Sequence, residues 1–154
     1  MRKTAFLTIL LGCLASAQAA DPAPSSRKAA ASAAASSAPA AHPLLGTWRW
    51  TLTGKGCTET LQYRSNSTRQ SRSGEELTQA DYGISAMPSL LGFYRLVETV
   101  TQSNGKPDCA GDLHEASGES STRFIQFSPQ LDQLIVCKEE SLKACFGPLK
   151  RLPG

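Results

Sequence analysis

The stretch LGTWRWTLTGKGCTETLQYR, residues 45–64, decides the fold that we expect for this chain of 154 residues. Residues 46–52 alternate, with Trp48 and Trp50 on one face and small or charged side chains on the other. Residues 57–64 alternate in the same way after a Gly-Lys-Gly turn. A period of two is typical of a half-buried β-strand. The stretch therefore predicts two β-strands joined by a turn.

The rest of the domain continues this pattern of short strands and turns. Further strands are expected at residues 68–73, 82–85, 93–102, 123–128, 134–138 and 144–149. Asn104-Gly105 is a strong tight-turn signal, and residues 139–143 are expected to form one helical turn. About eight short strands without a long amphipathic helix favour an antiparallel barrel or sandwich. We expect a small up-and-down barrel, because closure removes exposed strand edges.

The amino-terminal residues 1–19 predict a secretory signal peptide. Basic Arg2 and Lys3 precede a short apolar run, which ends in small residues with Ala-x-Ala spacing up to Ala19. The apolar run is shorter than the ~20 residues that cross a bilayer, so we expect no membrane span. The residues before Cys13 also resemble a bacterial lipobox, and a lipid anchor at Cys13 is the alternative. The mature protein is expected to be periplasmic or secreted.

Composition and charge divide the remainder into a linker and a domain. Residues 20–42 are rich in Ala, Ser and Pro and predict a disordered linker, because they offer almost nothing to bury. The β-barrel domain is expected over residues 43–154. From His42 onward, twelve Lys and Arg residues balance twelve Asp and Glu residues. A folded nucleic-acid-binding domain carries a basic patch, so the balance argues against nucleic acid as a partner.

Four cysteines remain after the signal peptide: Cys57, Cys109, Cys137 and Cys145. An even number of cysteines in a small exported domain predicts two disulfides. Four cysteines allow three pairings, and the sequence does not choose among them. One possibility bridges neighbouring strands through Cys137 and Cys145. The competing hypothesis is a metal site, but the CxxC spacing typical of such sites is absent from the sequence.

Residue patterns typical of catalysis are scarce, and we expect a protein that is not an enzyme. The sequence has two histidines, His42 at the domain edge and His114 in a turn-rich acidic stretch. Asp112 and Glu115 beside His114 are plausible metal ligands, but the simpler interpretation is a solvated loop. Phosphate loops, HExxH and dinucleotide motifs do not occur in the sequence. No cofactor and no metal are therefore expected.

The pattern Leu-x-Gly-x-Trp ending at Trp48, followed by Cys57, resembles two related kinds of barrel. Gly-x-Trp on a first strand looks like lipocalin-type barrels. The longer pattern over residues 44–61 is similar to the bacterial periplasmic inhibitors of alkaline metalloproteases. That resemblance implies an eight-stranded barrel plugged by Trp48, with Trp50 beside it, and inhibition by an amino-terminal trunk that enters the protease cleft. The alternative for both tryptophans is a role in core packing.

Three classes of function follow from these observations. The first is a protein that binds or inhibits another secreted or envelope protein, with a hydrolase as the possible partner. The second is a lipocalin-like carrier of a small molecule, and the third is a redox or metal-binding envelope protein. We favour the first class. If loops rather than the tail grip the partner, residues 86–91 and 108–115 are the expected contacts.

Overall fold

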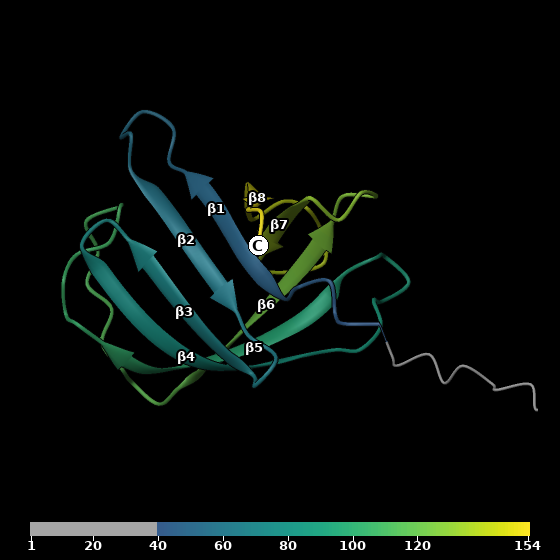
Figure 1. Cartoon of the computed structure of the whole chain (residues 1–154), viewed down its shortest axis with the longest axis horizontal. Helices are drawn as coiled ribbons and strands as arrows, with labels where there is room; N and C mark the ends of the chain where they lie inside the picture. Colours follow the sequence, from purple (N-terminus) through teal and green to yellow (C-terminus); the bar gives the residue numbers. More distant parts are fainter. Residues whose placement is uncertain (1–39) are drawn as a thin grey trace, which may run out of the picture. The chain divides into compact units, whose positions relative to one another are not determined.

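The computed structural model describes residues 40–154, so the expected signal peptide, Cys13 and most of the linker lie outside the described residues. Within residues 40–154, eight antiparallel strands close into an up-and-down barrel (Figure 1). The strands are β1 (Gly46–Thr51), β2 (Thr58–Tyr63), β3 (Thr68–Ser73), β4 (Glu76–Ile84), β5 (Tyr94–Ser103), β6 (Ser120–Phe127), β7 (Gln133–Cys137) and β8 (Cys145–Arg151). The predicted fold class is confirmed. None of the described residues forms a helix long and apolar enough to cross a membrane.

Strand β4 differs most from the sequence prediction, which placed only a short strand at 82–85. It is nine residues long and begins at Glu76. Its central residues Ala80 and Asp81 have low strand propensity, which hid the strand from the sequence pattern. The strand forms nevertheless because it pairs with β3 on one side and with β5 on the other.

Two of the loops between strands also differ from the sequence prediction. The helical turn expected at 139–143 is wrong, because these residues form turns and bends, and Leu142 has a φ of 59°. A residue in this left-handed conformation cannot continue a right-handed helix. The turn signal at Asn104 opens a long loop, residues 104–119, before β6 begins. The Asn104 side chain fastens this loop to β4, accepting a hydrogen bond from the Leu77 amide at 3.0 Å.

The barrel interior has two halves of different chemistry. The apolar half is lined mainly by β1 and β6–β8, with contributions from the neighbouring strands and from the segment before β1. Its buried cluster consists of Leu44, Trp48, Tyr63, Leu96, Ile125, Leu134, Val136 and Leu149. The polar half is lined by β2–β5. Its buried or half-buried polar residues are Glu59, Arg69, Ser73, Glu76, Thr78 and Glu98.

Each half carries one disulfide, which confirms the prediction that all four cysteines are paired. Cys57 bonds to Cys109 and joins the β1–β2 loop to the β5–β6 loop. Cys137 bonds to Cys145 and joins β7 to β8, where the two residues face each other in register. The sequence left three pairings open, and the structure has the one that joins Cys57 to Cys109 and Cys137 to Cys145. Disulfides of this kind are typical of chains that fold in an oxidising compartment.

Candidate functional site

Trp48 lies at the centre of the apolar half and is fully buried. Its indole Nε1 donates a hydrogen bond to the Leu44 carbonyl at 2.8 Å. The Arg151 guanidinium lies 4.1 Å from the centre of the indole ring, at cation–π distance. Arg151 also donates to the carbonyls of Leu45 and Leu131, at 2.7 and 2.9 Å. These contacts hold the segment before β1 and the last strand against one side chain.

Trp50, the second tryptophan expected near the barrel end, lies in a different environment. It is half-buried, and its ring lies 5.5 Å from that of Phe146, which is 38% exposed. Trp50 therefore packs beside the β7–β8 turn, where solvent reaches it. Of these two residues, Trp48 alone is enclosed on all sides.

The polar half is organised around an ion pair. Arg69 Nε lies 2.9 Å from Glu98 Oε1, and both side chains are largely buried. The Tyr63 hydroxyl donates to the same carboxylate at 3.1 Å. Burial, together with the negative charge of Glu98, raises the pKa of Tyr63 well above its usual range, so the phenol stays protonated. The interior groups of this half therefore bond to one another.

His114 fastens the β5–β6 loop to the polar half. Its Nδ1 lies 3.1 Å from Glu76 Oε1 and 4.0 Å from Asp108 Oδ2. Asp112 and Glu115, which the sequence suggested as companions of His114, are exposed. Over residues 40–154, His, Cys, Asp and Glu side chains form no group of three or more that could hold a metal ion. His114 thus acts as a loop fastener whose partner is a distant residue of β4.

The β4–β5 loop, residues 85–93, exposes large apolar side chains. Met87 is 76% exposed, Leu91 is 61% exposed and Leu90 is 106% exposed. Side chains of this size are normally buried when they lie close together, and clusters of exposed apolar residues often mark interaction sites. The loop matches one of the two contact loops that the sequence analysis named.

Hydrogen bonds hold this loop in one conformation. The Ser89 amide donates to the Phe93 carbonyl at 2.8 Å, and the Gly92 amide donates back to the Ser89 carbonyl at 2.9 Å. The Ser89 hydroxyl also donates to Glu140 on the β7–β8 loop at 3.0 Å. The side chain of Gln126 on β6 donates to the Leu91 carbonyl at 3.2 Å. The apolar side chains are therefore presented on an ordered loop.

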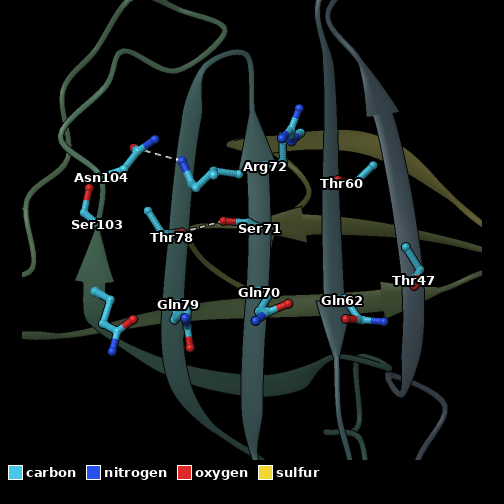
Figure 2. A pocket seen from close by; sticks show the side chains of 12 residues that line it. Thr47, Thr60, Gln62, Gln70, Ser71, Arg72, Thr78, Gln79, Ser103 and Asn104 are labelled. Atoms are coloured by element: carbon cyan, nitrogen blue, oxygen red, sulfur yellow. Dashed lines mark hydrogen bonds between the residues drawn. The ribbon is translucent and has the colours of Figure 1, made fainter.

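A polar groove follows β1–β5, and most of its lining residues face outward, whereas Ser71, Thr78 and Ser103 share the inward face. It has a volume of about 620 Å³, and Figure 2 shows the side chains that line it. The lining residues are Thr47, Thr60, Gln62, Gln70, Ser71, Arg72, Leu77, Thr78, Gln79, Gln102, Ser103 and Asn104. Leu77 is the single apolar side chain among them. The sequence analysis did not predict this groove, although the alternation in β2 indicates that Gln62 lies on the face away from the core.

Comparison with known proteins gives no relative. No family model matches the chain, and no curated protein or solved structure matches it either. Three features of the structure therefore bear on the function: the exposed 85–93 loop, the interior polar groups that bond to one another, and the polar groove.

Proposed function

We propose that this protein is a non-enzymatic, exported β-barrel that binds and inhibits another secreted or envelope protein. The 85–93 loop is the proposed contact site. The observation that carries the proposal is the full exposure of Leu90 on a loop fixed by hydrogen bonds, with Met87 and Leu91 beside it. A periplasmic or extracellular location is part of the proposal, which the two disulfides support.

The exposed side chains supply the free energy that such an interface needs. Burying one Leu or Met side chain stabilises a complex by about 1.5–3 kcal/mol. Because the loop is already ordered, it loses little conformational entropy on binding, and less of the binding free energy is offset. Three such side chains within five residues form a compact anchor for an apolar depression on the partner.

Two observations favour protein binding over the alternative functions. The interior polar groups of β2–β5 bond to one another, as Arg69 and Tyr63 do with Glu98, which leaves a carried small molecule few free partners. The four cysteines of the described chain are all in disulfides, so none of them offers a free thiol for redox exchange or metal binding. The small-molecule carrier and the redox or metal-binding protein therefore rank below a binding protein.

The partner class comes from the resemblance of residues 44–61 to inhibitors of alkaline metalloproteases. That resemblance implies an extracellular hydrolase as partner and a trunk ahead of the barrel as the inhibitory element. Most of the corresponding tail, residues 20–41, lies outside the described residues. Variants of the 85–93 loop and of the tail therefore test these two contact sites separately.

The test is an inhibition assay against secreted metalloproteases and lysozymes, with four proteins compared. They are the mature chain, the Leu90→Ser/Leu91→Ser variant, the deletion of residues 20–41, and Leu131→Ser as a control. Leu131 is 45% exposed on the β6–β7 loop, outside the proposed contact site. We expect the double variant to weaken inhibition at least tenfold, since it removes two apolar side chains that the proposed complex buries. The control should leave inhibition unchanged.

Other outcomes would correct the proposal. Loss of inhibition on deleting residues 20–41, with no effect of the loop variant, would assign the contact to the tail. Binding of the mature chain to phospholipid vesicles through Leu90 and Leu91, without inhibition of any hydrolase, would replace the protein partner by a lipid surface. Saturable binding of a hydrophobic fluorophore without either activity would favour the carrier.

A further inference from the structure

Four glutamine side chains form a continuous row across the outer face of the barrel. Gln62 of β2 faces Gln70 of β3, Gln70 faces Gln79 of β4, and Gln79 faces Gln102 of β5. Thr47 of β1 extends the row beyond Gln62. Neighbouring strands lie ~4.8 Å apart, so the four amides cover roughly 15 Å. Figure 2 shows Gln62, Gln70 and Gln79 side by side on the same face as Thr47.

The two ends of this row differ in how their amides are used. Arg64 donates to Gln62 Oε1 at 2.8 Å and to Gln70 Oε1 at 2.6 Å. These bonds orient both amides, because each oxygen points to Arg64 and each NH₂ group is left as a donor. Gln79 and Gln102 are exposed, and their amides bond to no other residue of the described chain. The row therefore offers fixed donors at one end and free donors and acceptors at the other.

Three cations lie beside one end of the glutamine row, and of these Arg72 alone lines the groove. Lys150 of β8 faces Arg49 of β1, which faces Thr60, and Thr60 faces Arg72 of β3. The ion pairs found in residues 40–154 involve none of these three cations. The carboxylate that shares this outer face is Asp81 of β4, which lies on the opposite side of the glutamine row, facing Thr68 and Thr99. The groove thus carries the positive charge of Arg72 on β3, with Arg49 and Lys150 beyond its β1 end.

The lining restricts the chemistry of an occupant. Small-molecule sites in proteins are lined mainly by apolar and aromatic groups, whereas here Leu77 is the one apolar lining residue. Little hydrophobic driving force is available, so affinity must come from many hydrogen bonds and from charge. A chain of hydroxyl groups matches the alternating amide donors and acceptors, and carboxylates match Arg49, Arg72 and Lys150.

We propose that the outer groove binds an acidic polysaccharide, a chain that carries both hydroxyl and carboxylate groups. The chain lies along the glutamine row, across β2–β5, with carboxylates toward Arg72 and, at the β1 end, toward Arg49 and Lys150. Because each neutral hydrogen bond contributes little by itself, a single sugar binds weakly and affinity rises with chain length until the row is filled. This site is separate from the 85–93 loop, so it adds a second binding activity to the proposed one.

The experiment measures binding of the mature protein to three soluble polymers by calorimetry at low salt. Polygalacturonate carries hydroxyls and carboxylates, dextran carries hydroxyls alone, and polyglutamate carries carboxylates alone. We expect polygalacturonate to bind at least tenfold more tightly than either of the others. Galacturonate oligomers of increasing length should bind with increasing affinity.

Matched variants locate the site. Gln79→Ala/Gln102→Ala should weaken polygalacturonate binding about tenfold, and Arg72→Ala should weaken it and flatten its dependence on salt. Gln130→Ala and Arg95→Ala serve as controls, because both residues are exposed and neither lines the groove. The substituted side chains are all exposed, so melting temperatures should stay close to that of the parent protein.

Several results would overturn the proposal. Absence of binding to polygalacturonate would remove the site. Equal binding of polyglutamate would show that charge alone acts, and equal binding of dextran would show that the cations play no part. Unchanged affinity in the glutamine double variant would place the ligand elsewhere on the barrel. Inhibition of hydrolases is measured separately, so neither proposal depends on the other.

Discussion

The two halves of the barrel interior are held together by different kinds of interaction. In the apolar half, Trp48 and its neighbours exclude water, and the indole is enclosed by Leu44 and Arg151. In the polar half, Arg69 forms an ion pair with Glu98, and the hydroxyl of Tyr63, whose ring belongs to the apolar cluster, donates to the same carboxylate. Burial is non-directional and roughly proportional to area, whereas paired polar groups require a specific geometry. We therefore expect the apolar half to supply most of the stability and the polar half to constrain the register of β2–β5.

The largest effect is expected when the buried indole of Trp48 is truncated. Trp48→Ala should lower the free energy of unfolding by about 3–5 kcal/mol, because it leaves a cavity and removes the contact with Arg151. Arg49→Ala, its exposed neighbour on the outer face, should change it by less than about 0.5 kcal/mol. Urea unfolding followed by fluorescence of Trp50 measures both. Equal losses for the two variants would contradict the assignment of the inner face.

The two disulfides should differ in what their removal does. Cys57 and Cys109 are 52 residues apart, and Cys137 and Cys145 are 8 apart. On the chain-entropy relation the long bridge stabilises by about 4 kcal/mol and the short one by about 2.5 kcal/mol. Paired Cys→Ser variants of each bridge, compared by melting temperature, should show the larger drop for Cys57/Cys109. The reverse order would mean that β7–β8 pairing depends on its crosslink more than loop length predicts.

Breaking the ion pair should be less damaging than removing Trp48, and it should be reversible. Arg69→Met leaves Glu98 largely buried without its cation, which should cost about 3 kcal/mol. Adding Glu98→Gln removes the unpaired charge while keeping an acceptor for Tyr63. A double-mutant cycle measured by urea unfolding should therefore recover most of the loss. Additive losses would show that the two charges do not act as a pair.

The smallest expected effect concerns pH and the segment before β1. His42 packs edge-on against Tyr94, with ring centres 5.0 Å apart, and its Nδ1 accepts a hydrogen bond from the Leu44 amide. Burial lowers the pKa of His42 below its ordinary value of 6.5. As pH falls, the unfolded chain takes up this proton first, so stability present above pH 6.5 is lost toward lower pH.

His42→Gln is the matched variant for this effect, because glutamine keeps an acceptor and does not titrate. Its melting temperature should fall less than that of the parent protein between pH 7.5 and pH 5. All other residues are the same in the two proteins, so their contributions cancel in the difference. Identical pH profiles would mean that the segment before β1 detaches before His42 is protonated.

The sequence was informative where side chains alternate strongly and silent where distant strands must be brought into register. Alternation around Trp48 was enough to place the first strand and its inner face. At β4, the weak strand formers Ala80 and Asp81 concealed a strand that exists because it pairs with both of its neighbours. Cysteine count predicted two disulfides, but their pairing depended on which loops meet in space.

The candidate site shows the same limit more sharply. The outward direction of Gln62 follows from local alternation, but its alignment with Gln79 and Gln102 depends on two turns and on a bulge beside Gln79. His114 likewise bonds to Glu76, 38 residues away, and not to its acidic sequence neighbours. The sequence pattern predicts which face of a strand a side chain occupies. It does not predict which residues of other strands lie beside that side chain, and the candidate sites consist of such neighbours.

The barrel closes through a narrow seam, since β1 meets β8 over only two residue pairs, Trp48 with Arg151 and Arg49 with Lys150. The strand that seals the cylinder is also the last of the eight along the chain. Pairing across such a sequence distance is slow and must await both partners. A nascent chain that still lacks β8 has an open edge and an incompletely covered indole. The cylinder therefore closes only after all eight strands have been synthesised.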